Sequence, residues 1–293
     1  MPLTRRLFAA FAIVALAACS SSKSIRQQGA ANVEVVTTIS TLNSFVQGVG
    51  GDLVHVQSIV PIGASPETFQ PAPQDVAMLS GAQLLVENGA GLETWLDRML
   101  SQSNNTSLKR VVCTDGLPVE NDNPHLWMDP QLAKRYVFAI RDGLIAVDPV
   151  HAGTYKRNAI TYAGKLDALT YSIQSRINTI PPSHRYMVVF HNAWYYYNKR
   201  FGLTTLGFVE RNPGQEPNPQ QIARLIDLAK QHHVKGVFSE PEYSPKLLYT
   251  IAQGAGIGVV ENLYDDSIGT DPRVADYIGM LDYDTGVIVK TLK

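Results

Sequence analysis

Cysteine is nearly absent from this sequence, and so is an excess of charge of either sign. Two cysteines occur in 293 residues, Cys19 near the start and Cys113 further along the chain, so a framework of disulfides is excluded. Stability must come from a core, for which 45% hydrophobic residues are sufficient. The net charge of −1 offers no basic surface that would attract nucleic acid. After residue 18 no apolar run approaches the about 20 residues of a membrane-spanning helix.

The first 31 residues are typical of an export leader followed by a polar tether. Two arginines precede an apolar run over residues 7–18 that is too short to span a bilayer, which indicates a signal peptide, residues 1–18. The run ends in LAAC, which resembles a bacterial lipobox, so we expect cleavage before Cys19, lipidation of Cys19 and a tether over residues 19–31. An ordinary signal peptide with a chance cysteine is the alternative. Export by the general or the twin-arginine route would place the protein at a membrane facing the periplasm or the cell exterior.

The remaining chain alternates short apolar runs with helical stretches, which is typical of an α/β fold. Four strands are predicted in the first half and four in the second, each followed by a helical pattern. The predicted strands lie at 31–40, 53–60, 83–89, 108–115, 185–191, 203–209, 234–240 and 257–264. The fold class predicted is therefore α/β with two similar lobes, each a mostly parallel four-stranded sheet flanked by helices.

One long helix is predicted between the two lobes. Apolar residues recur at steps of three or four from Tyr155 to Ile180, which is the helical period. About 30 residues at ~1.5 Å each would make a helix of roughly 45 Å, long enough to run from one lobe to the other. The expected domains are an N-terminal lobe over 32–148, a linking helix over 149–180 and a C-terminal lobe over 181–293. Such a helix would limit the motion of the lobes to a modest closure.

Four polar segments follow predicted strands, two in each half. They contain Glu67 in PIGASPETFQPAP, His125 in NDNPHLWMDP, His191 in VVFHNAW, and the neighbours Asp265 and Asp266 in NLYDDSIG. In open α/β sheets, ligands bind beyond the carboxyl ends of the strands. Gaps of 58 residues or more exclude a local zinc finger, because its ligands come in close pairs. A site built from these residues would have to be assembled at the seam between the lobes.

Each of these residues also has a structural interpretation. A lone histidine such as His191 more often has a structural role, and Glu67 could be a solvated turn residue. His125 and Asp266 could each cap a local turn. Asp129, directly before Pro130, is interpreted only as a helix N-cap.

The four segments together resemble the metal-receptor lipoproteins of bacterial ABC importers for zinc and manganese, from the lipobox through to the second lobe. NPHLWMDP is the most specific motif, and GASPETFQPAP, FHNAWYYYNKRFGL and DDSIG resemble the other ligand loops of that family. The resemblance implies that Glu67, His125, His191 and Asp266 enclose one divalent ion, with Asp265 as the alternative to Asp266. We also expect the aromatic residues that follow His191, Trp194 to Tyr196, to exclude water and to orient its ring.

Glu67 departs from the family pattern, which usually has histidine at this position. Two histidines and two carboxylates are a harder ligand set than three histidines, compatible with Zn²⁺, Mn²⁺ or Fe²⁺. The resemblance implies capture of the ion and its delivery to an ABC importer permease by a monomer that is not an enzyme. The alternatives are a membrane-anchored metallohydrolase, although no HExxH motif occurs, and a surface adhesin as a secondary role.

Overall fold

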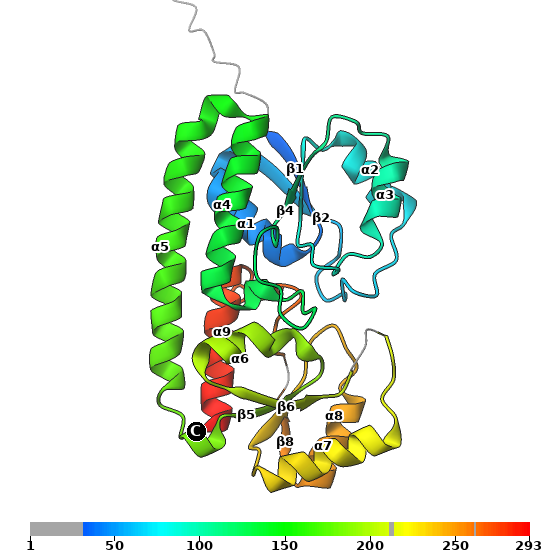
Figure 1. Ribbon diagram of the computed structural model, residues 1–293, viewed down its shortest axis with the longest axis vertical. Coiled ribbons are helices and arrows are strands. Elements are labelled where there is room, and N and C mark those ends of the chain that lie inside the picture. Colours follow the sequence, from blue (N-terminus) through cyan, green and yellow to red (C-terminus); the bar gives the residue numbers. More distant parts are fainter. Residues whose placement is uncertain (1–31, 211–213, 261) are drawn as a thin grey trace, which may run out of the picture. The chain divides into compact units, whose positions relative to one another are not determined.

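Two parallel four-stranded sheets form the framework of the molecule (Figure 1). The computed structural model describes residues 32–210, 214–260 and 262–293. The expected signal peptide, residues 1–18, and the tether with its lipidated Cys19, residues 19–31, lie outside these residues. The first sheet has the strand order β2-β1-β3-β4 and the second the order β6-β5-β7-β8, so both put the first strand of the lobe in the interior. The predicted two-lobe α/β fold is confirmed.

The strands are shorter than the apolar runs that predicted them, because each run continues into a loop at its carboxyl end. The strands are β1 (Val33–Thr37), β2 (Val54–Ser58), β3 (Leu84–Glu87), β4 (Lys109–Val112), β5 (Tyr186–Val189), β6 (Thr204–Phe208), β7 (Gly236–Phe238) and β8 (Gly258–Val260). All pairs are parallel; for example, Val33 of β1 pairs with Val54 of β2, and Val188 of β5 with Val237 of β7. Parallel pairing places the loops after β2 and β4 at one edge of the first sheet, and those after β5 and β8 at one edge of the second.

Helices cover the sheets and connect the two lobes. The shorter ones are α1 (Ser40–Gly50), α2 (Pro73–Gly81), α3 (Leu96–Ser103), α6 (Tyr195–Phe201), α7 (Pro219–Gln231) and α8 (Lys246–Ala255), and the longer ones are α4 (Pro130–Val147), α5 (Ala152–Ile177) and α9 (Tyr277–Leu292). Among the described residues, no helix combines the length and the hydrophobicity that a membrane span requires. Cys113 is buried and free, which agrees with a structural role as a small apolar side chain.

The long helix α5 runs beside both lobes (Figure 1). Its 26 residues correspond to about 39 Å. This is shorter than expected, because residues 149–151 form a 3-10 turn and the α-helix ends at Ile177. The predicted stripe is buried along its whole length. Near one end α5 packs on α1, where a Cβ on Gly48 would collide with the ring of Tyr162; near the other end it packs on α9.

The last helix, α9, also belongs to both lobes, which the sequence pattern did not predict. At its start, the backbone N–H of Tyr277 donates to Ser44 Oγ of α1 at 3.0 Å, and the Tyr277 hydroxyl donates to the Trp127 carbonyl at 2.5 Å. Further along, Thr285 shares a hydrogen bond of 2.8 Å with the Tyr197 hydroxyl of α6. One apolar cluster, which includes Val35 of β1 and Met187 of β5, therefore continues from lobe to lobe.

We predict that α5 stabilises the fold through its buried stripe and not through its exposed face. Replacing the fully buried Ile173 by alanine should lower the free energy of unfolding by about 2–5 kcal/mol, because it removes packed methyl groups and leaves a cavity. Ile160 of the same helix is 67% exposed, so Ile160→Ala should change it by less than about 0.5 kcal/mol. Urea unfolding of the two variants measures the difference, and equal losses would contradict this account.

Candidate metal centre

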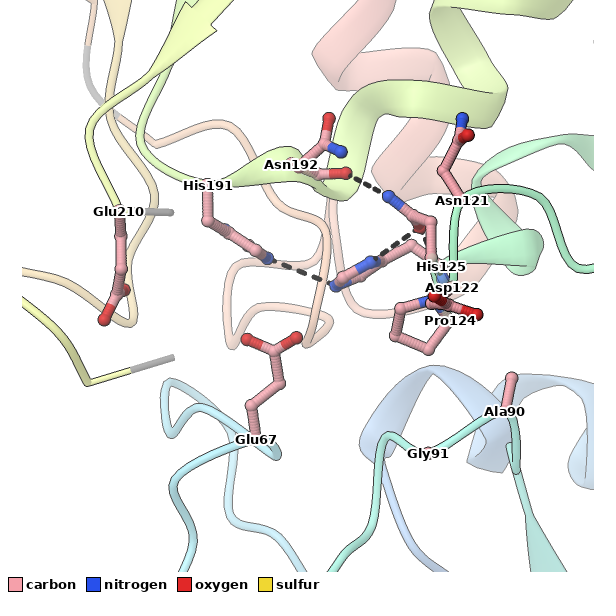
Figure 2. A pocket seen from close by; sticks show the side chains of 11 residues that line it. Glu67, Ala90, Gly91, Asn121, Asp122, Pro124, His125, His191, Asn192 and Glu210 are labelled. Atoms are coloured by element: carbon pink, nitrogen blue, oxygen red, sulfur yellow. Dashed lines mark hydrogen bonds between the residues drawn. The ribbon is translucent and has the colours of Figure 1, made fainter. Parts of the chain in front are cut away.

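Three of the predicted site residues form a compact cluster at the seam between the lobes. The Nε2 atoms of His125 and His191 lie 3.2 Å apart (Figure 2). Asp266 Oδ1 lies 3.4 Å from His125 Nε2, and Asp266 Oδ2 lies 3.6 Å from His191 Nε2. All three side chains are buried. Residues at least 66 positions apart in sequence thus bring three metal-ligating side chains together.

Each residue of the cluster comes from a loop that follows a strand. His125 lies in the long loop after β4, just before the 3-10 turn Leu126–Met128 that leads into α4. His191 follows β5 and precedes the 3-10 turn Asn192–Trp194. Asp266 lies between β8 and α9. The cluster therefore forms where the carboxyl ends of strands from both sheets meet, as expected for open α/β sheets.

Asn123 fixes the ring of His125. Its Oδ1 accepts two hydrogen bonds of 3.0 Å, one from the His125 backbone N–H and one from Nδ1. Because the carbonyl oxygen only accepts, Nδ1 carries the proton and Nε2 keeps a free lone pair. Asn123 Nδ2 donates to the Asn192 carbonyl at 2.7 Å, which ties this loop to the one that carries His191.

Glu240 fixes the ring of His191. Its Oε2 lies 2.5 Å from His191 Nδ1, and its side chain is fully buried. Burial alone would lower the pKa of His191, but the carboxylates of Glu240 and Asp266 outweigh burial and raise this pKa well above that of a free imidazole. A carboxylate on Nδ1 leaves Nε2 directed into the cluster and makes it a stronger donor to a metal.

The expectation that the aromatic residues after His191 set its orientation is wrong. The Trp194 indole donates to Asp265 Oδ2 at 3.1 Å, and the Tyr196 hydroxyl donates to the Asn123 carbonyl at 3.1 Å. The Tyr195 hydroxyl bonds to Glu120, away from the cluster. The described aromatic residue that does contact the His191 ring is Tyr243, at 5.3 Å between centroids.

The two neighbouring aspartates have different environments. Asp265 already accepts hydrogen bonds from the Trp194 indole and, at 2.7 Å, from the Asp266 backbone N–H. By contrast, neither carboxylate oxygen of the buried Asp266 has a hydrogen-bond partner of ordinary geometry among the described residues. Burial would raise the pKa of Asp266, but the two imidazoles lower it below the usual value. The two imidazoles offset the burial of this carboxylate, and its oxygens remain available to a metal ion.

Glu67 lies across a cavity from the two histidines. The cavity measures about 350 Å³ and is lined by Glu67, His125, His191 and Glu210 among others. Figure 2 shows the Glu67 carboxylate pointing from its loop towards the gap between the two imidazoles. Burial raises the pKa of Glu67, and nearby His125 partly offsets this effect. Glu67, His125 and His191 therefore face one cavity, and Asp266 lies beside the two histidines.

The spacing of the cluster fits one tetrahedral metal ion. Zinc-to-nitrogen and zinc-to-oxygen bonds of about 2.0–2.2 Å at tetrahedral angles separate two ligand atoms by about 3.3–3.6 Å. The distance of 3.2 Å between the two Nε2 atoms, and those of 3.4 and 3.6 Å from these atoms to the two Asp266 oxygens, are close to this range. An ion at the centre would also neutralise Asp266 and satisfy both Nε2 lone pairs.

Glu240 was not predicted from the sequence, although its position in the chain indicated a possible role. This glutamate ends the segment VKGVFSE and lies two residues after the end of β7. It is therefore another polar residue at the carboxyl end of a strand, like the residues that were predicted. It begins EPEYSPKLLYTIAQGAGIGVV, a segment that also resembles the family, but its partner is 49 residues away. Asp129 does cap α4, as expected, by accepting from the Gln131 N–H, and it also pairs with Arg200 of α6 at 2.7 Å.

Comparisons with known proteins identify the family of this chain. The model of the family described as zinc-uptake complex component A, periplasmic, matches residues 35–291. The chain belongs to this family. The manganese-binding lipoprotein MntA of Halalkalibacterium halodurans is 31% identical over 94% of each chain, and the iron-binding protein YfeA of Yersinia pestis is 31% identical over 97% of this chain and 96% of its own.

Solved structures of similar proteins show the same architecture. The manganese-bound periplasmic metal-binding protein of Candidatus Liberibacter asiaticus is 27% identical, covers 89% of this chain and 100% of its own, and superposes with a TM-score of 0.78. The two sheets and the long helix are thus the architecture of the zinc-uptake component A family.

We predict that Glu240 is needed for tight metal binding although it does not face the ion. Glu240→Ala should weaken binding about 10- to 100-fold, because the carboxylate partner of the ligating histidine is lost. Glu240→Gln should weaken it less, since an amide oxygen can still accept from Nδ1.

The matched control for Glu240 is Glu34, which pairs in the same way with His55 Nδ1 at 2.7 Å but is half exposed at the surface. Glu34→Ala should leave metal affinity unchanged. Competition titration with a chromogenic chelator measures all three variants, and equal affinities for Glu240→Ala and Glu34→Ala would refute the role of Glu240.

Proposed function

We propose that this protein captures one divalent transition metal ion outside the cytoplasm and delivers it to the membrane permease of an ABC importer. The observation that carries this proposal is the buried cluster of two imidazole nitrogens and one carboxylate, at distances that suit the ligands of a tetrahedral metal ion. Membership of the zinc-uptake component A family supports it, and so do relatives named for manganese and iron binding.

The proposed ligands are Glu67, His125, His191 and Asp266. The incoming ion is hydrated, and four protein groups replace its water molecules. With all four tetrahedral positions taken by protein, no metal-bound water remains to be activated, so the site suits retention and not hydrolysis. The histidines must be neutral and the carboxylates ionised, so protons compete with the metal and affinity falls in acid.

The proposed cargo is Zn²⁺ or Mn²⁺, and Fe²⁺ is compatible with the same ligands. Two imidazoles and two carboxylates form a harder set than the three histidines usual in the family, which moves the preference towards manganese and iron. The relatives named for manganese and iron support this breadth. The affinity of most such sites still rises from Mn²⁺ to Zn²⁺. Which metal the protein carries in the cell therefore also depends on how much of each metal is available.

The proposed location is the cell envelope, with the protein anchored through an acylated Cys19. Residues 1–18 would be removed as a signal peptide, and residues 19–31 would tether a monomeric body. Within that body, we propose an N-terminal lobe over 32–148, the linking helix over 149–180 and a C-terminal lobe over 181–293. Relatives named as lipoproteins support the anchor.

We predict that either histidine of the cluster is indispensable for metal capture. His125→Ala and His191→Ala should each weaken binding of Zn²⁺ and Mn²⁺ more than about 100-fold, because each removes a ligand and not merely a partner of a ligand. His55→Ala, at the exposed surface, should have no effect. Isothermal titration with each metal provides the measurement. Affinity within tenfold of the wild type in both cluster variants would refute the proposed site.

A further inference from the structure

The loop that carries Glu67 is held in place from the opposite lobe by Tyr243. This tyrosine follows β7, and its ring stacks on Phe190 at 4.3 Å between centroids with an interplanar angle of 16°. The same ring lies 5.3 Å from that of His191. Its hydroxyl donates to Ser65 Oγ at 3.1 Å, and Ser65 is two residues before Glu67. One side chain thus contacts a proposed ligand of one lobe and the ligand loop of the other.

The Glu67 loop is attached to its own lobe as well, but at a different residue. Trp95 Nε1 donates to the Pro66 carbonyl at 2.8 Å, which fixes the backbone directly before Glu67. On the side of the second lobe, the Gly63 backbone N–H donates to Ser267 Oγ at 3.1 Å. Both described hydrogen bonds between this loop and the second lobe, those of Gly63 and Ser65, are therefore neutral.

The loop that carries His125 is attached to the second lobe by ion pairs as well as by hydrogen bonds. Its Glu120 forms an ion pair with Lys199 of α6, and Asp129 pairs with Arg200 of the same helix at 2.7 Å. Asn123 adds the hydrogen bond to the Asn192 carbonyl. His125 is thus tied to the second lobe by charged groups, whereas Glu67 depends on neutral hydrogen bonds. Of the two proposed ligands from the first lobe, Glu67 is the one whose loop has no ion pair with the second lobe among the described residues.

We infer that Tyr243 is a positioning residue for Glu67: its hydroxyl holds the Glu67 loop against the metal cavity and thereby slows escape of the bound ion. This inference rests on the proposed function of the site. His125, His191 and Asp266 stay assembled without Tyr243, so they still capture the ion. When the Ser65–Tyr243 hydrogen bond breaks, the Glu67 carboxylate leaves the cavity and opens the path along which the ion leaves.

The test compares Tyr243→Phe, Ser65→Ala and the double variant, each in the presence and absence of Glu67→Gln. Phenylalanine keeps the ring that packs on Phe190 and His191 and removes only the hydroxyl. Stopped-flow mixing of the Zn²⁺-loaded protein with excess chelator measures the dissociation rate. Each single variant should release Zn²⁺ about 3- to 10-fold faster, which corresponds to the loss of one neutral hydrogen bond.

The double variant distinguishes a shared interaction from two unrelated effects. If the two hydroxyls act only through their shared hydrogen bond, the double variant should release Zn²⁺ no faster than either single variant. In the Glu67→Gln background, Tyr243→Phe should raise the Zn²⁺ release rate by less than twofold, because the tyrosine hydroxyl acts by positioning Glu67. Tyr155→Phe is the control, since it removes a buried tyrosine hydrogen bond, to Asp148 at 2.6 Å, at the start of α5.

Three results would overturn the inference. The first is a release rate for Tyr243→Phe within twofold of the wild type. The second is an acceleration that persists undiminished in the Glu67→Gln background, which would assign the effect to packing on His191. The third is an equal acceleration in Tyr155→Phe. Failure of the wild-type protein to bind Zn²⁺ at all would instead refute the proposed function, and this inference with it.

Discussion

The structure depends on two buried imidazoles whose Nε2 atoms face each other beside a buried carboxylate. His125 and His191 approach to 3.2 Å through their Nε2 atoms, and Asp266 offers both oxygens to the same point. Burial of the carboxylate is tolerated because the two imidazoles face it, and the same grouping offers three side chains to a metal ion. Asn123 and Glu240 enforce it by occupying the other nitrogen of each ring.

The fold keeps these groups together although they come from separate lobes. The carboxyl ends of strands from both sheets meet at the site, and α5 and α9 each pack against both lobes behind it. Because one apolar cluster continues through this interface, separation of the lobes would expose core surface. Release of the ion is therefore expected to use the least attached part of the site, the Glu67 loop, and not a wide opening of the whole molecule.

The sequence predicted the architecture because periodicity is a local property. The alternating runs placed all eight strands, and the three- and four-residue steps from Tyr155 onwards placed α5. Which side chains meet across the fold is not a local property of the sequence. Glu240 and Tyr243 were therefore not predicted, and Trp194 was given the wrong role. Periodicity also could not distinguish Asp265 from Asp266; the hydrogen bonds from the Trp194 indole and the Asp266 backbone N–H show that the Asp265 carboxylate is already occupied. The position of α9 across both lobes likewise arises from tertiary packing.

X-ray absorption at the zinc edge tests the central claim most directly. Protein loaded with one equivalent of Zn²⁺ should show a first shell of two imidazole nitrogens at about 2.0–2.1 Å and carboxylate oxygens at about 2.0–2.2 Å, with four ligands in total. A first shell without two imidazoles, or a six-coordinate shell of oxygen atoms only, would show that His125, His191 and Asp266 do not converge on the ion.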